Sequence, residues 1–382
     1  MIVRATTTPG LEDVALEEGE RLLGESGFTV STRYERLSDF VGAAHGDPSD
    51  AGVTDVSYIG WQIDGVRSDY PPFAAIAGSR LRRGARSIYH LTVHVGVLNW
   101  HGDLDSLVEA TLRIDYPELS EVARRGGRFR VTCHRSGSHA FQSPDVERAV
   151  GGALFNRYGC AVDLERPDLN VAVDVVGPTA VVGYQLSGRK GMDRRHDWRF
   201  HPRITLRTPV AYGMLRLAGY TKQPGPLMDP FCGAGTILLE AGGIANDIGV
   251  PVPALRASDR EPAAVHGTTE NLRAAGLSAD VAQIDVHELK ANVEADSLDY
   301  VVTDPPFGVR LGRKIDYHFL YQSLLAGAAY GLRSGGRLVL LVDHRRGVFD
   351  AVASGFRAFE PTHARRVTIG GLSPELIVLR RA

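Results

Sequence analysis

From Pro226 onward the chain alternates short apolar runs with amphipathic segments, and this pattern constrains its fold most. The apolar runs lie at residues 226–228, 254–258, 279–284, 298–303 and 337–342. Strands that alternate with helices predict a largely parallel sheet with helices on both faces. Two final runs, 366–369 and 376–379, are separated by a Gly-Gly turn, which predicts an antiparallel edge hairpin. We therefore expect an α/β, doubly wound domain with a seven-stranded sheet.

Four consecutive strands of this predicted sheet end in an aspartate, namely Asp229, Asp259, Asp285 and Asp304. The carboxyl ends of parallel strands meet at one edge of the sheet, which is where such folds bind their ligands. A single aspartate at such a position often only caps a loop. Four acids on one edge favour a binding site instead.

The first strand runs into a glycine-rich turn, Asp229-Pro-Phe-Cys-Gly-Ala-Gly-Thr236, and a helix begins at once. Gly233 and Gly235 permit a tight turn with close backbone approach to a ligand, and a helix N-terminus favours an anionic group. A dinucleotide fingerprint would need a third glycine where Leu238 stands, which disfavours a dehydrogenase that uses NAD. In this Rossmann-like pattern Asp259 could bind ribose hydroxyls and Asp285 an adenine amino group.

The fourth strand ends in Asp304-Pro305-Pro306-Phe307. The prolines fix φ and remove two backbone donors, which leaves carbonyl oxygens and a carboxylate as acceptors. Phe307 adds a flat face, so the turn predicts a slot for a planar group that carries N–H donors, such as a nucleobase amine. The alternative is a strand-ending turn plugged by an aromatic ring.

Charge is unevenly distributed along these 382 residues, although the net charge is only −2. Residues 122–140 hold five arginines, two histidines and no acid, and residues 186–207 hold seven basic residues against two acids. This segregation favours a polyanionic partner over a set of merely solvated charges. The length predicts two or three domains. Three widely spaced cysteines, with no metal-ligand spacing, leader or membrane-length apolar run, predict a cytoplasmic protein without metal.

The N-terminal half mixes short strands and helices. The clearest helix signal has Ser143 at its N-cap and Pro144 at its first position, and Gly159 is the expected C-cap. The runs 169–176 and 180–186 predict a hairpin around Gly177-Pro178.

The glycine-rich turn together with Asp304-Pro-Pro-Phe307 resembles the class I S-adenosylmethionine-dependent methyltransferases that act on exocyclic amines. Within that class the chain is similar to tRNA guanine-N2 methyltransferases that carry a THUMP domain, because residues 8–12 and 129–143 resemble the N-terminal part of that family. The resemblance implies four segments: a ferredoxin-like lobe at 1–65, a THUMP domain at 66–186, a linker at 187–204 and a methyltransferase domain at 205–382.

The resemblance also implies residue roles. The expected catalytic residues are Asp304, Pro305, Pro306 and Phe307. Those expected to bind S-adenosylmethionine are Asp229, Phe231, Gly233, Gly235, Thr236, Asp259, Arg260, Asp285, Val286 and Asp304. Those expected to contact RNA are Arg128, Arg130, Arg135, His139, Arg189, Lys190, Arg194, Arg195 and Arg310.

The implied function is formation of N2-methylguanosine in tRNA, at position 6 of the acceptor stem, by a monomer whose THUMP region grips the acceptor end. Guanosine 10 of tRNA and a guanine of ribosomal RNA are alternatives within this class. Methylation of adenine or of a glutamine amide is a further alternative, since such enzymes share the acid-Pro-Pro-aromatic turn. A non-catalytic tRNA-binding protein is the alternative from another class, which the intact set of four aspartates disfavours.

Overall fold

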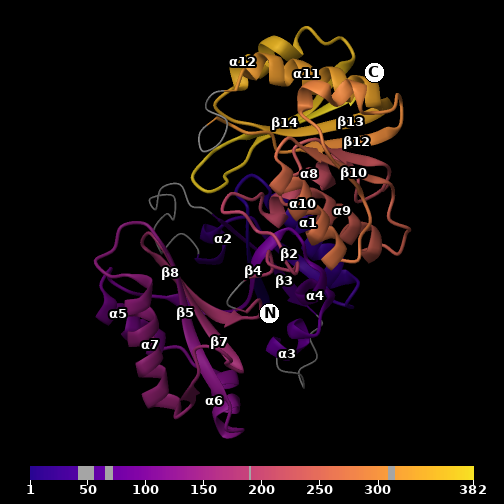
Figure 1. The fold of residues 1–382 in the computed structure, drawn as a ribbon. Helices are drawn as coiled ribbons and strands as arrows, with labels where there is room; N and C mark the ends of the chain where they lie inside the picture. The colour runs from indigo at the N-terminus through magenta and orange to yellow at the C-terminus, as the bar shows by residue number, and fades with distance from the viewer. Residues whose placement is uncertain (42–55, 65–71, 189–190, 309–314) are drawn as a thin grey trace. The chain divides into compact units, whose positions relative to one another are not determined.

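The computed structural model describes residues 1–41, 56–64, 72–188, 191–308 and 315–382 (Figure 1). The chain forms two compact units, Met1–Met192 and Asp193–Ala382, each with its own sheet and core. Every helix in the described ranges is too short or too polar to serve as a membrane span.

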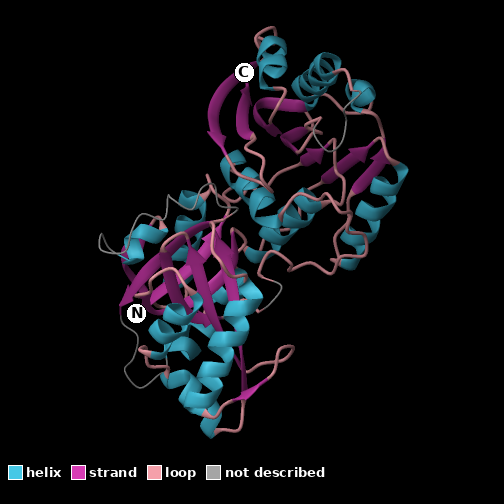
Figure 2. Cartoon of the chain, turned by 90° about the vertical axis from the view of Figure 1, so that its left-hand side faces the viewer, coloured by secondary structure: helices cyan, strands magenta, loops and turns pink. Residues whose placement is uncertain are grey.

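The first unit is built on an eight-stranded mixed sheet of order β2-β3-β1-β4-β8-β7-β5-β6. Its strands are β1 (Ile2–Thr7), β2 (Thr29–Tyr34), β3 (Ser57–Asp64), β4 (Ile88–Leu98), β5 (Arg128–Ser136), β6 (Ala161–Val162), β7 (Leu169–Val176) and β8 (Thr179–Gln185). Its helices are α1 (Glu12–Gly24), α2 (Leu37–Val41), α3 (Pro72–Ala77), α4 (Arg80–Gly84), α5 (Leu104–Leu112), α6 (Pro117–Arg124) and α7 (Ser143–Tyr158). Figures 1 and 2 show the helices gathered beside the strands.

Local sequence explains the best-defined elements of this unit. Helix α7 ends at Gly159, whose φ of 64° is the left-handed conformation that glycine tolerates. Its start differs from the expectation. Gln142, and not Ser143, is the N-cap, because Gln142 and Asp145 form a reciprocal capping box. The turn between β7 and β8 has Gly177 at φ 54°, as a two-residue hairpin turn requires.

One continuous sheet links the two segments that the resemblance separates at residues 65 and 66. Strand β4 pairs with β1 on one side and with β8 on the other, both antiparallel. A single core cluster includes Val3 of β1, Leu91 of β4 and Val173 of β7. The predicted lobe and THUMP segments therefore share one core, and their bounds remain predictions.

A buried ion pair crosses this shared sheet. Arg4 of β1 is 1% exposed and donates to the carboxylate of Asp174 on β7, which is separated from β1 by the two strands β4 and β8. Its other terminal nitrogen lies 2.9 Å from Nδ1 of His94. Burial, followed by the charge of Arg4, lowers the pKa of His94 to about 3, so that ring is neutral and can accept from Arg4. This network links side chains of β1, β4 and β7 within the shared sheet.

Breaking this pair should be costly, because it leaves a buried charge without a partner. We expect Asp174→Ala to lower the free energy of unfolding by about 3 kcal/mol. Glu25→Ala removes an exposed partner of Arg21 and Arg80 and should cost less than about 1 kcal/mol. Denaturant unfolding measures the free energy of unfolding of both variants. Equal losses of this free energy would contradict the structural role of the buried pair.

The second unit is a seven-stranded sheet of order β11-β10-β9-β12-β13-β15-β14. Its strands are β9 (Leu227–Asp229), β10 (Leu255–Asp259), β11 (Asp280–Gln283), β12 (Leu298–Thr303), β13 (Leu332–Val342), β14 (Phe359–Arg366) and β15 (Glu375–Arg381). Its helices are α8 (Thr208–Ala218), α9 (Thr236–Asp247), α10 (Pro262–Ala274), the 3-10 helix η3 (Val286–Ala291), α11 (Tyr317–Gly331) and α12 (Arg346–Ala353).

The predicted doubly wound sheet is confirmed in this unit. Strands β9 to β13 pair in parallel, and β15 pairs antiparallel with both β13 and β14. Figure 1 shows α11 and α12 on one side of the sheet and α8, α9 and α10 on the other. The edge hairpin is real, but β14 is Phe359–Arg366 and not the expected 366–369. Ile369 instead forms an isolated bridge with Leu372 inside the connecting loop.

Candidate active site

The strand order of the second unit reverses between β9 and β12, which are neighbours in the sheet. Asp229 ends β9 and Asp304 directly follows β12, so both acids lie at this switch point. The hydroxyl of Thr303 donates to Oδ1 of Asp229 over 2.6 Å. This bond ties the ends of the two central strands together.

The glycine turn adopts the open geometry that its sequence predicts. Gly233 and Gly235 have φ values of 53° and 81°, which disfavour any residue with a side chain. A Cβ built on Gly233 would meet no described atom within 4 Å, so space remains over this turn. Oδ2 of Asp259 accepts the N–H of Gly233 at 3.1 Å and thereby links the second strand to the turn.

Two buried polar residues of α10 hold this turn from behind. Thr268 donates to the carbonyl oxygen of Gly233 at 3.0 Å, and Asn271 donates to that of Ala234 at 2.9 Å. Both side chains are almost fully buried, at 0% and 2% exposure. They were missed in the sequence analysis, although two polar residues three positions apart on the inner face of a helix were a usable signal.

The segment that follows Met192 is packed onto the second unit. Oδ1 of Asn271 accepts the N–H groups of Arg199 and Phe200, and its amide also donates to the carbonyl of Phe200. The Phe200 ring occupies the space over Gly267, where a Cβ would lie 2.1 Å from it. Asn271 therefore uses all its hydrogen-bonding groups to connect this segment to the glycine turn.

A buried glutamate of α9 anchors the same segment. Glu240 is 0% exposed, and its Oε1 lies 2.7 Å from Nε2 of His196 and 3.6 Å from Nε of Arg195. From residue 193 on, the predicted linker is thus bound along α9 and α10. Arg195 neutralises a buried acid, which leaves its charge less available for RNA than we expected.

The remaining residues expected to bind the cofactor lie along the same edge. Asp285 caps η3 by accepting from the N–H of His287. Arg260 is exposed and paired with Glu261 at 3.1 Å. The others are more enclosed: Thr236 begins α9 and is buried, Val286 belongs to the core, and Phe231 packs against that core.

Asp304 carries an acceptor with no partner. Among the described residues its Oδ1 is enclosed and receives no hydrogen bond. Burial raises the pKa of Asp304 to about 7. Burial also raises the pKa of Asp229 to about 7, although Thr303 and the N–H of Phe231 donate to it. An unpaired buried carboxyl group indicates a position kept for a ligand.

The other three residues of the predicted catalytic turn follow Asp304 directly. Pro305 is buried, and Pro306 and Phe307 are half-buried. Phe307 therefore keeps part of its ring accessible, as stacking on a base requires. Arg310, expected to contact RNA nearby, lies outside the described residues.

The predicted RNA contacts of the first unit differ in how far they are exposed. Arg128 is 60% exposed, although Asp163 lies 3.1 Å away. Arg130 is only 5% exposed and donates to the carbonyl of Leu164, so it is not presented to a phosphate. Arg135 donates to the carbonyl of Gly137 and lies 3.2 Å from Nδ1 of His139. Arg135 and His139 therefore form contacts within the loop after β5.

The other predicted RNA contacts lie between residues 189 and 195 or at Arg310. Arg194 is exposed, whereas Arg195 is engaged by Glu240. Arg189 and Lys190 lie outside the described residues. No cluster of potential metal ligands occurs in the ranges that the structure describes.

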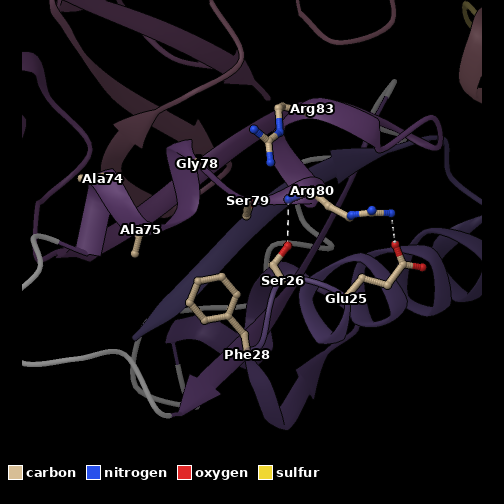
Figure 3. Close-up of a pocket in the computed structure, with 9 residues that line it drawn as sticks. All are labelled: Glu25, Ser26, Phe28, Ala74, Ala75, Gly78, Ser79, Arg80 and Arg83. Carbon is tan, nitrogen blue, oxygen red and sulfur yellow. Dashed lines mark hydrogen bonds and ion pairs between the residues drawn. The ribbon is translucent and has the colours of Figure 1, made fainter. Parts of the chain in front are cut away.

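Figure 3 shows a different pocket, in the first unit, of about 370 Å³. It lies between the end of α1 and helices α3 and α4. Arg80, at its rim, is paired with Glu25 at 2.9 Å, and its N–H donates to Ser26. None of the predicted site residues lines this pocket, so it is separate from the switch-point site.

Comparison with known proteins agrees with this site. The model of the RMKL-like methyltransferase domain matches residues 195–375, and that of the THUMP domain matches residues 101–184. The tRNA (guanine(6)-N2)-methyltransferase of Thermus thermophilus is 35% identical over 393 residues and aligns over 100% of both chains. The chain belongs to the THUMP-containing tRNA guanine-N2 methyltransferase family. This confirms the resemblance seen in the sequence.

Two further relatives of this family support the assignment. The tRNA (guanine(6)-N(2))-methyltransferase THUMP3 of Bos taurus is 32% identical over 66% of this chain, which corresponds to 51% of that protein. The crystal structure of TrmN from Thermus thermophilus has a TM-score of 0.71 and 30% identity, and covers 100% of this chain and 99% of that one.

The described residues fit S-adenosylmethionine, the cofactor of this methyltransferase class. The open space over Gly233 admits a ligand close to the backbone. Asp259 accepts two backbone N–H groups and Asp285 accepts one, and both carboxylates keep further lone pairs for hydroxyl or amino donors. The unpaired Asp304 carboxyl group lies at the same edge.

Removing Asn271 should loosen the glycine turn. Asn271→Ala leaves two N–H groups and two carbonyl oxygens without this partner, and we expect a loss of about 2 kcal/mol in unfolding free energy. S-adenosylmethionine should also bind more weakly in calorimetry. Glu270→Ala, at the neighbouring and more exposed position, should change both quantities little. Unaltered cofactor affinity in Asn271→Ala would contradict the positioning role.

The raised pKa of Asp304 predicts how stability changes with pH. Its ordinary value is 3.8 and its value in the fold is about 7, so between these values the folded state binds more protons than the unfolded state. The contribution of Asp304 to wild-type stability should therefore fall as pH rises from 4 to 8. Asp304→Ala should flatten this fall, whereas Asp280→Ala, at an exposed position, should not. If the unfolding free energy changed with pH in the same way in all three proteins, the prediction would be wrong.

Proposed function

We propose that this protein forms N2-methylguanosine at position 6 of tRNA, using S-adenosylmethionine. The observation that carries the reaction type is the enclosed, unpaired Oδ1 of Asp304 beside the glycine turn at the switch point. A guanine 2-amino group supplies the missing donor. Family membership supports tRNA as the substrate, and two relatives named for guanine 6 support the position.

In this proposal the chain acts mainly by positioning. The Asp304 carboxylate and the Pro305 carbonyl would accept the two N–H bonds of the amine, while Phe307 stacks on the base. Holding both N–H bonds favours a pyramidal nitrogen whose lone pair is free to react. S-adenosylmethionine, when bound, supplies an electrophilic methyl group. Positioning and electrostatics are then sufficient to lower the barrier.

The raised pKa of Asp304 also fits a role after the reaction. Methylation leaves an extra proton on the nitrogen, and a carboxylate hydrogen-bonded to that N–H can accept it. A group with a pKa near 7 can then return this proton to water at neutral pH. The base must leave any helical stack to reach the enclosed carboxyl group.

We further propose that the THUMP region holds the acceptor end of tRNA and that the enzyme acts as a monomer. The exposed Arg128 and Arg194 are the described members of the predicted set that are best presented to phosphates. Cytoplasmic location and the domain bounds given above stay part of this proposal.

Asp304→Ala tests the reaction directly. We expect methyl transfer to unmodified tRNA to fall about 100-fold or more, because the main acceptor of the amine is lost, while S-adenosylmethionine still binds. Nucleoside mapping of the wild-type product should show N2-methylguanosine at position 6. Asp280→Ala, on the opposite edge of the sheet, should retain activity. Wild-type turnover in Asp304→Ala would refute the mechanism, and no transfer by wild type would favour a non-catalytic tRNA-binding protein.

A further inference from the structure

Arg345 lies at the edge of the sheet that carries the proposed active site. Strand β13 is the parallel neighbour of β12 and ends at Val342, three residues before Arg345. Strand β12 ends at Thr303, directly before Asp304. The carboxyl ends of both strands face the same way, so the segments that follow them share one edge.

A tyrosine ring connects Arg345 to the catalytic turn. The guanidinium carbon lies 5.1 Å from the centre of the Tyr317 ring, within cation–π range. Tyr317 is buried, and a Cβ on Gly308 would fall 2.9 Å from its hydroxyl oxygen. Gly308 is the residue directly after Phe307. Arg345 is therefore one aromatic ring away from the predicted base-binding turn.

The charge of Arg345 is not neutralised by the fold. Among the described residues no carboxylate lies within 4.0 Å of its guanidinium, and its Nε is enclosed without a hydrogen-bond partner. The adjacent Arg346, by contrast, binds both oxygens of Asp350, at 2.8 and 2.9 Å, and also pairs with Glu375. A cation left unpaired beside an active site is available to an anion from outside the chain.

A second cation lies close to the same ring. Burial raises the pKa of Tyr317, and the charges of Arg345 and Arg260 both oppose this rise. Arg260 directly follows Asp259, one of the acids at this edge. Arg260 is paired with Glu261 at 3.1 Å, so Arg345 is the cation near this ring that has no carboxylate partner among the described residues.

We propose that Arg345 binds a backbone phosphate of the RNA next to the guanine that is methylated. This inference rests on the proposed function, because it assumes that a nucleotide enters the Asp304 turn. Such a nucleotide brings phosphate groups about one sugar away from its base. The cation–π contact with Tyr317 restrains the guanidinium group, and a guanidinium fork suits two phosphate oxygens. The alternative role is structural, with Arg345 serving only to pack Tyr317.

The test compares Arg345→Gln, Arg345→Lys and Arg333→Gln with wild type in the full-length protein. Arg333 starts β13 at the opposite edge and pairs with Asp299, so its variant removes the same charge away from the site. The measurements are kcat/KM for unmodified tRNA over a salt series, the dissociation constant of S-adenosylmethionine, and Tm.

We expect Arg345→Gln to lower kcat/KM for tRNA about tenfold at low salt, through KM, with unchanged cofactor affinity. The slope of log kcat/KM against log salt should become shallower by about 0.7 to 1, as loss of one phosphate contact predicts. Arg345→Lys should keep the wild-type slope, because it keeps the charge. Arg333→Gln should match wild type throughout.

Other outcomes overturn the inference. An unchanged salt slope in Arg345→Gln would show that no phosphate contact was lost. Weaker S-adenosylmethionine binding would assign Arg345 to the cofactor instead. A packing role would lower Tm in both the Gln and the Lys variant. It would also lower kcat/KM by the same factor at every salt concentration. Failure of the proposed function is separate, since wild type itself would then transfer no methyl group to tRNA.

Discussion

The hydrogen bond from Thr303 to Asp229 is the contact on which the active site depends. It joins the ends of β9 and β12, where the strand order reverses. The hydroxyl oxygen of Thr303 lies 2.6 Å from Oδ1 of Asp229. Burying a carboxyl group is costly unless donors compensate it, and Thr303 with the N–H of Phe231 provides that compensation for Asp229. Asp304, next along the chain, receives no such donor among the described residues. The fold thus satisfies one acid and leaves an acceptor of the other unpaired, which is the position that we propose for the substrate amine.

A second layer of side chains makes the glycine turn rigid enough to act as a binding surface. Glycine-rich backbone loses much conformational entropy when it is ordered, so it needs supporting contacts. Thr268 and Asn271 supply them from α10, and Asp259 supplies one from the neighbouring strand. Asn271 also binds the segment around Phe200, which makes the chain after Met192 part of the methyltransferase unit. A site held in this way is pre-formed before its ligand binds.

Much of this arrangement could be predicted because it depends on local sequence. Apolar runs that alternate with helical segments predicted the sheet, and the aspartates that end four of them predicted its ligand-binding edge. The supporting residues were missed because their contacts join distant positions. Thr303 reaches Asp229 across 74 residues, and Asn271 reaches Phe200 across 71. Periodicity reports which face of an element is buried, but it does not report which polar groups meet there. The β14 strand was misplaced for a related reason, because its exposed outer face carries little apolar signal.

The sequence by itself determined the fold class, the acidic edge and the acceptor-rich character of the Asp-Pro-Pro-Phe turn. Residue type and spacing suffice for these features because strand ends and proline geometry follow from local backbone rules. Only the tertiary structure decided which charges are free to act. Arg130 is buried, Arg195 is held by Glu240, and Arg345, which the sequence did not distinguish, has no carboxylate partner among the described residues. Whether an arginine is neutralised depends on which acid the packing brings within about 4 Å, and that distance is a property of the folded chain alone.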